Sequence, residues 1–178
     1  MDFIYNEHFI EHLSSDEGTK VLCECFRCLK VGGVLRIAAP DLGYVIHKYD
    51  TDWSDQDWLS WPGYEAINTK GKMINASFRW WGHKYLYDED DLREQLARTG
   101  FTHIIRCSIN ESDYEDLRNL ETRQDSTLII EASKEDSSHK PITALPRTRE
   151  PREDVVNQRQ LATENTALLV RSYRVLTR

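Results

Sequence analysis

The sequence predicts an α/β protein built around an open sheet, and three observations predict it. Two short β-prone runs, at 2–6 and 34–39, flank a helical pattern, which is the order of a β-α-β unit. A second helix and two further strands follow between 88 and 133. All five tryptophans lie between these parts, in a stretch with neither periodicity. The 178 residues suffice for one domain, and 39% hydrophobic with 30% charged residues is typical of a globular one.

The opening unit has clear local signals. The run at 2–6 is a strand rich in β-prone residues. Ser14 and Glu17 have the spacing of a capping box, so a helix should begin there and continue to about residue 30. The pair Gly32-Gly33 stops it. The mostly apolar run at 34–39 then predicts a strand buried in a parallel sheet.

The second part is predicted in the same way. Asp88 can cap a helix that ends at Gly100. Strands follow at 101–108 and 126–133, joined by a polar connection with a turn of helix at 114–120. The stretch 42–86 reads as an aromatic-rich insertion that caps the sheet, with a short helix at 42–49. After 134 the composition becomes polar and basic, so 135–178 is expected to be a flexible tail or a weak helix over 153–176.

Charge and cysteine content exclude several classes of protein. Residues 1–138 carry a net charge of −11 and residues 139–178 a net charge of +4, so the acidic body should repel nucleic acid. No apolar run is long enough to span a membrane. Met1 is followed at once by Asp2 without a signal peptide, which predicts a cytoplasmic, reducing location with free thiols. Cys23 and Cys25 point about 200° apart on a helix, so no metal site is expected.

The chain contains Glu11-His12-Leu13, then a helix and Leu29-x-x-Gly32-Gly33, and later Asp91-Leu92, Leu96 and Gly100-Phe101. In this order these motifs resemble the C-terminal half of the class I S-adenosylmethionine-dependent methyltransferase domain. The resemblance covers 1–134 and implies a partial Rossmann-like sheet in the family order 4-5-7-6, whose last two strands are antiparallel. The stretch 78–88 is similar to predicted methyltransferases of polysaccharide biosynthesis.

One family element is absent. The glycine-rich loop that holds the cofactor must follow a strand and open a helix. No Gly-x-Gly-x-Gly occurs in the chain, and Gly32-Gly33 precedes a strand. The S-adenosylmethionine site is therefore expected to be incomplete. We interpret the chain as a truncated domain or one half of a split enzyme, whose strand 2–6 offers an open edge to a partner.

The resemblance implies a set of site residues. Cofactor binding falls to Asn6, Glu7 and His8, at the carboxyl end of the first strand. The predicted catalytic residues are His8, Glu11 and His12, because an imidazole can accept a proton from a hydroxyl group. The aromatic faces, the guanidinium and the imidazole of the insertion could bind a sugar or a ring-shaped substrate, and the substrate-binding residues would be Arg79, Trp80, Trp81 and His83. A structural role is the alternative for both groups. Glu11 and His12 could serve simply to hold their loop in place, and the tryptophans could pack together as a small core.

The predicted function is methyl transfer from S-adenosylmethionine to an oxygen or nitrogen of a small molecule or glycan precursor. The chain alone is expected to have little activity. A non-catalytic interaction module is one alternative. A nucleotide-binding oxidoreductase is another, although the antiparallel last strand pair and the Glu-His motif argue against it.

Overall fold

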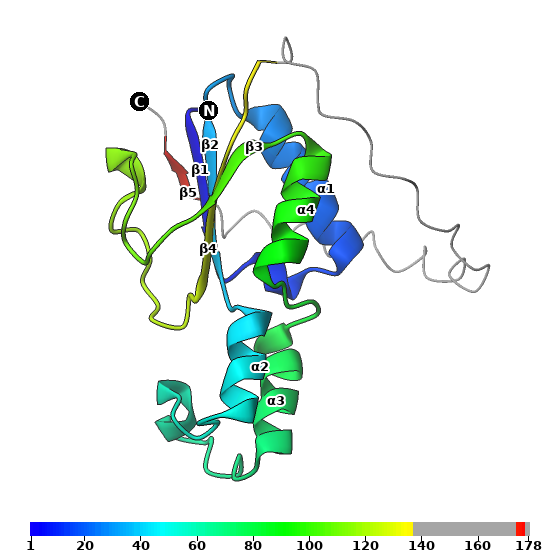
Figure 1. Ribbon diagram of the computed structural model, residues 1–178, viewed down its shortest axis with the longest axis vertical. Coiled ribbons are helices and arrows are strands. Elements are labelled where there is room, and N and C mark those ends of the chain that lie inside the picture. Colours follow the sequence, from blue (N-terminus) through cyan, green and yellow to red (C-terminus); the bar gives the residue numbers. More distant parts are fainter. Residues whose placement is uncertain (137–173, 177–178) are drawn as a thin grey trace, which may run out of the picture.

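The computed structural model describes residues 1–136 and the backbone of 174–176, and it confirms an α/β fold (Figure 1). One sheet has the order β3-β4-β2-β1-β5. Its strands are β1 (Phe3–Glu7), β2 (Val34–Ala39), β3 (Thr102–Arg106), β4 (Leu128–Ser133) and β5 (Arg174–Leu176). The helices are α1 (Ser15–Cys28), α2 (Leu42–Asp50), α3 (Lys70–Arg79) and α4 (Glu89–Thr99), with 3₁₀ turns η1 (Ile10–His12), η2 (Asp57–Ser60), η3 (Trp80–Gly82) and η4 (Glu115–Leu117).

The predicted β-α-β unit is confirmed. β1 and β2 run parallel, in a register that places Phe3 beside Val34. The capping box of α1 forms, because the Glu17 amide donates to Ser14 Oγ at 3.3 Å and the Ser14 amide donates to the Glu17 carboxylate at 2.9 Å. β4 lies antiparallel to both β2 and β3. The carboxyl ends of β1 and β2 therefore point toward the same end of the sheet.

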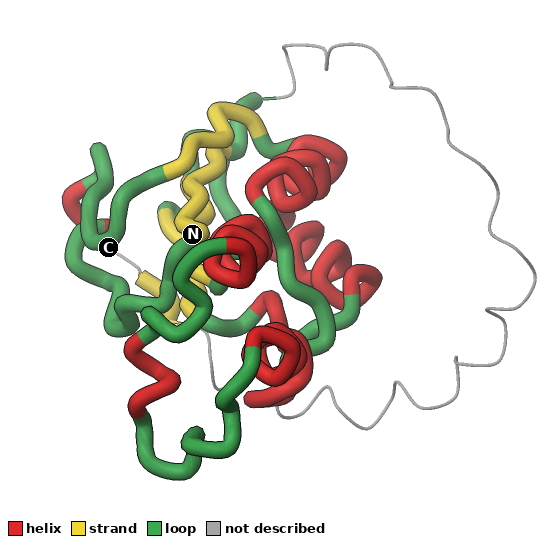
Figure 2. Tube along the Cα trace, turned by 60° about the horizontal axis from the view of Figure 1, so that its bottom comes forward, coloured by secondary structure: helices red, strands yellow, loops and turns green. Residues whose placement is uncertain are grey.

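One face of the sheet is covered by α1 and α4, and the main core lies there. The longer helices lie on one side of the strands in the tilted view of Figure 2, and only short helical turns appear on the other side. α1 contributes Leu22 and Cys25, and α4 contributes Leu92 and Leu96; all four are almost completely buried. Burying each leucine contributes about 1.5–3 kcal/mol. The helical spacing of these residues was visible in the sequence, so this layer was predictable.

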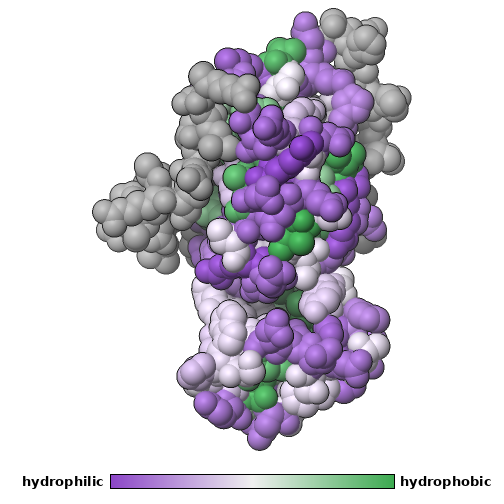
Figure 3. All heavy atoms as spheres, turned by 90° about the vertical axis from the view of Figure 1, so that its left-hand side faces the viewer, coloured by the Kyte–Doolittle hydropathy of each residue, from purple (hydrophilic) through white to green (hydrophobic). Residues whose placement is uncertain are grey.

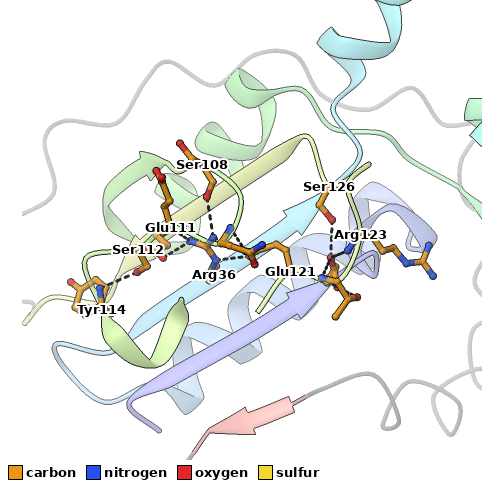
Figure 4. A network of polar contacts seen from close by, with 12 residues as sticks. Arg36, Ser108, Glu111, Ser112, Tyr114, Glu121, Arg123 and Ser126 are labelled. Carbon is orange, nitrogen blue, oxygen red and sulfur yellow. Dashed lines mark hydrogen bonds and ion pairs between the residues drawn. The ribbon is translucent and has the colours of Figure 1, made fainter. Parts of the chain in front are cut away.

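The opposite face of the sheet is covered by the connection between β3 and β4. A charged side chain that sequence analysis did not predict to be buried lies on this face. Arg36 of β2 is 0% exposed. Its guanidinium donates to Glu121 at 2.7 and 3.0 Å and to Glu131 at 2.6 Å. It also donates to the carbonyl oxygens of Glu111 and Ser108 at 2.9 and 3.3 Å (Figure 4). Every guanidinium proton is therefore used, and the connection is tied to the centre of the sheet.

The edge of β1 differs from the prediction. The sequence predicted an open edge and a weak helix over 153–176. Most of that helix lies outside the described residues, but 174–176 form β5, which pairs antiparallel with β1 and places Val175 beside Ile4. The edge is thus covered by a strand from the same chain. The edge of β1 presents unpaired amide and carbonyl groups, and an extended segment can form hydrogen bonds with them.

The aromatic segment, residues 42–86, extends beyond the carboxyl ends of β1 and β2. The short helix expected at 42–49 is confirmed as α2, and it lies against α3, which sequence periodicity did not reveal (Figure 1). Met73, Ala76 and Ile67 form a small separate core there, with Trp53 and Trp58 packed against it. No helix in the described part of the chain is long and apolar enough to cross a membrane.

Candidate functional site

A pocket of about 780 Å³ lies where β1 and β2 end, between the sheet and the aromatic segment. Most of the lining residues come from three parts of the chain: residues 8–12, the aromatic segment and the loop before β4. In Figure 3 pale side chains of intermediate hydropathy cover much of the lower part of the molecule, where the aromatic segment lies. The lining residues used below are His8, His12, His83, Trp58, Trp61, Tyr64, Trp81, Arg123 and Asp125. In open α/β sheets this end of the strands is where ligands bind.

Glu7, the last residue of β1, holds the loop that forms one wall of the pocket. Its carboxylate accepts hydrogen bonds from the amides of Thr122 and Arg123 and from the hydroxyls of Thr122 and Ser126, at 2.7–3.1 Å. Burial by itself would raise the pKa of Glu7, but these donors outweigh it and hold the pKa below its usual value. In the structure the Glu7 oxygens position the loop, and the predicted role of Glu7 in cofactor binding stays a prediction.

Glu11 lies behind the pocket surface, among histidines. Its side chain is 0% exposed, and Oε1 lies 3.1 Å from His8 Nδ1 and 3.8 Å from His12 Nε2. His8 is 8% exposed, and its Nε2 lies 3.6 Å from Asp125 Oδ1. His8 has a φ of +47°, which costs a non-glycine residue conformational energy. The three residues predicted as catalytic are therefore brought together, with His12 the most accessible at 35%.

His83 reaches this cluster from the aromatic segment. The amides of Lys84 and Tyr85 donate to the Glu11 carbonyl oxygen at 2.8 and 3.1 Å, which fixes the segment against η1. The His12 and His83 rings then lie 5.2 Å apart. His83 Nδ1 lies 2.8 Å from the Ser77 carbonyl oxygen, which can only accept, so Nδ1 carries the proton. Burial lowers the pKa of His83, although the Ser77 hydrogen bond acts in the opposite direction.

Aromatic rings form the opposite wall. Trp81 Nε1 donates to Tyr64 Oη at 2.8 Å, and the two rings stack with centroids 6.0 Å apart. Trp58 meets Trp81 edge to face at 5.3 Å. Trp81 is 42% exposed and Trp61 is 46% exposed. These rings are therefore available to a ligand, whereas Trp53 and Trp58 pack partly in the small core.

The predicted substrate residues divide into two groups. Trp81 and His83 line the pocket, whereas Trp80 and Arg79 are exposed but are not among its lining residues. Of the predicted cofactor residues, Asn6 is buried at 3% exposure, and its Oδ1 has no hydrogen-bond partner among the described residues. The guanidinium that does line the pocket is that of Arg123. Sequence analysis missed it because Arg123 lies in a polar connection without periodicity.

The arrangement combines an aromatic wall, an arginine and several imidazoles. Such a pocket suits a ring-bearing ligand with an anionic or hydroxyl group. The imidazole of His12 opens onto the pocket, where it can face a substrate hydroxyl. The described residues that line the pocket contain no glycine-rich loop for a nucleotide.

No family model matches the chain, and no curated protein matches it. Among solved structures, a SAM-dependent methyltransferase from Archaeoglobus fulgidus is similar at 15% sequence identity with a TM-score of 0.42. The match covers 75% of this chain and 59% of that one. The chain therefore spans about three fifths of the length of this structure.

Proposed function

We propose that the chain takes part in S-adenosylmethionine-dependent methyl transfer and supplies the acceptor side of the active site. The observation that carries the proposal is the pocket at the carboxyl ends of β1 and β2, where His8, which follows β1, and His12 of η1 meet the aromatic wall. The motifs around Glu11-His12 and Gly32-Gly33, which resemble those of methyltransferases, are what select methyl transfer among the reactions such a crevice can support.

The acceptor is an oxygen or nitrogen nucleophile on a small molecule or glycan precursor. Trp81 and Trp61 present exposed rings against which a sugar or planar ring can pack. Arg123 offers a guanidinium to a phosphate or carboxylate. Methyl transfer requires the nucleophile to lie in line with the methyl group and the sulfonium, so the main task of these residues is to hold the acceptor in position.

Donor binding by this chain alone is expected to be weak, because the sequence has no Gly-x-Gly-x-Gly loop. Calorimetric titration with S-adenosylmethionine measures this directly. Transfer of a labelled methyl group to a panel of glycosides, nucleotide sugars and phenols then tests the reaction. Weak but measurable binding is expected. No detectable binding of S-adenosylmethionine together with failure of every acceptor, in a chain shown to be folded, would remove the proposal.

Two tryptophans provide a matched pair of variants for the acceptor side. Trp81 lines the pocket, and Trp80 beside it does not, although the two are 42% and 41% exposed. Trp81→Ala should weaken acceptor binding at least about tenfold, the loss of one well-packed aromatic contact. Trp80→Ala should leave it within about twofold. Equal losses in both variants would contradict the assigned wall.

A second candidate is an interaction module without catalysis. It is favoured by the exposed apolar side chains that gather on the aromatic segment, because such patches often mark binding surfaces. They are Tyr44, Ile46, Tyr49, Trp61, Phe78, Trp80 and Trp81. A folded chain that neither binds S-adenosylmethionine nor transfers a methyl group would support this candidate.

A further inference from the structure

The floor of the pocket contains a cluster whose chemistry goes beyond methyl transfer and does not depend on it. Glu11, His12 and His83 each offer one ligand atom, and these atoms all lie within 4.8 Å of one another. Glu11 Oε1 and His12 Nε2 are 3.8 Å apart. The amides of Lys84 and Tyr85, bonded to the Glu11 carbonyl oxygen, hold the two segments in this arrangement.

The Glu11 carboxylate is the strongest indication that the cluster binds a cation. It is 0% exposed, and within the described residues neither of its oxygens accepts a hydrogen bond. His8 Nδ1 lies 3.1 Å away but outside hydrogen-bond geometry. A buried carboxylate without donors is unfavourable unless a positive charge balances it. A cation between Glu11 and the neighbouring imidazoles would provide that charge.

His83 is prepared for ligation. Its Nδ1 proton is directed at the Ser77 carbonyl oxygen, at 2.8 Å, so Nε2 keeps its lone pair. A metal-bound histidine typically donates its other ring proton to a carbonyl or carboxylate group, which fixes the tautomer and the ring orientation. The fold supplies this second contact from α3, which carries Ser77.

We propose that Glu11, His12 and His83 bind one divalent transition-metal ion, best fitted by Zn²⁺, with an open coordination position facing the pocket. Two imidazoles and one carboxylate form a donor set that Zn²⁺ uses at catalytic sites. Tetrahedral ligands about 2.0–2.1 Å from zinc lie roughly 3.3 Å apart. The 3.8 Å between Glu11 and His12 would need to shrink by only about 0.5 Å.

The open coordination position of the proposed ion follows from the exposure of its histidine ligands to the pocket. His12 is 35% exposed, and both histidines line the pocket, so one side of the ion would face the cavity. A water molecule or a substrate hydroxyl or phosphate oxygen would complete the coordination. Zn²⁺ lowers the pKa of a bound water or hydroxyl toward neutrality. The site would thus bind and activate an oxygen ligand.

Two alternative arrangements would leave the cluster without an ion. In the first, protonated His8 balances the charge of Glu11, and the chain binds no metal. In the second, cysteines bind zinc instead, although Cys23 is exposed and Cys25 is buried, so the two do not converge. Among the described residues the converging ligand group is the one formed by Glu11 and the two histidines.

The test is titration of the full, metal-stripped chain with Zn²⁺ by calorimetry, with Co²⁺ as an absorption probe. One ion per chain is expected, with a tetrahedral Co²⁺ spectrum lacking a thiolate charge-transfer band. Glu11→Gln and His12→Ala should each weaken Zn²⁺ binding at least about tenfold. His47→Ala, which removes an exposed histidine of α2, should not change it.

Folding of the variants is checked by their thermal midpoints without metal. Glu11→Gln replaces a buried carboxylate that accepts no hydrogen bond from the described residues by a neutral group of the same shape, so its metal-free midpoint should equal or exceed that of the native chain. Absence of 1:1 binding, unchanged affinity in Glu11→Gln, or a thiolate band in the Co²⁺ spectrum would each overturn the proposal. None of these results depends on S-adenosylmethionine.

Discussion

Replacing Arg36 by methionine should destabilise the protein more than most single substitutions. Arg36 is 0% exposed and makes five hydrogen bonds of 2.6–3.3 Å. Without it, Glu121 and Glu131 would remain buried, at 0% and 1% side-chain exposure, with no countercharge. Removing one partner of such a network costs about 3–5 kcal/mol. For a chain of this size that lowers the thermal midpoint by roughly 6–20 °C.

The assay is thermal and urea unfolding followed by far-ultraviolet circular dichroism. Tryptophan fluorescence is less suitable, because all five tryptophans lie in the aromatic segment and would report mainly on it. Arg27 is the control, since its ion pair with Glu24 is exposed at 70% and 64%; Arg27→Met should change the midpoint little.

A triple variant separates charge from packing. Arg36→Met combined with Glu121→Gln and Glu131→Gln removes the unpaired charges, so most of the lost stability should return. The reasoning would be refuted if Arg36→Met cost less than about 1 kcal/mol, or if the triple variant were as unstable as the single one. In the first case the two carboxylates would not need their partner.

Three further substitutions test local contacts, and a fourth tests the strand pairing at the edge of the sheet. Glu7→Gln should destabilise the chain at neutral pH by about 1–3 kcal/mol, because an amide group would face the donors of Thr122. Tyr87→Phe should be neutral or stabilising, because the Tyr87 hydroxyl is buried without a partner in the described part of the chain. Gly18→Ala should destabilise although alanine favours helices, because its Cβ would overlap that hydroxyl. Val175→Pro should speed amide exchange in β1 by weakening β5.

Each of these outcomes has a check. The folded-state pKa of Glu7 lies below its usual 4.5, so its stabilising effect is complete above that pH and disappears as the pH falls through the folded value. Glu7→Gln should therefore flatten the loss of stability in acid. Tyr87→Phe should rescue Gly18→Ala; additive costs would show that the hydroxyl is not the obstacle. Unchanged exchange at 3–5 in Val175→Pro would argue against the β5 pairing.

The sequence by itself determined the elements whose signals are local. The capping box at Ser14 and the Asp88 cap predicted where two helices begin, because a helix terminus is satisfied by residues within one turn of it. Gly32-Gly33 predicted the end of α1 less closely, because the helix stops at Cys28 with Leu29 as its C-cap. The apolar run at 34–39 predicted a buried strand, because its composition is also a local property of the chain. Periodicity is a property of neighbours along the chain, so it can be read without knowing what packs against it.

Only the tertiary structure decided which distant residues meet. His83 reaches His12 because the backbone of 84–85 bonds to η1, and Arg36 became a buried ion because two glutamates of other segments close over it. The edge of β1 is covered by β5, a segment from the other end of the chain. Such contacts depend on how separate elements pack, and the chain carries no nearest-neighbour signal for them.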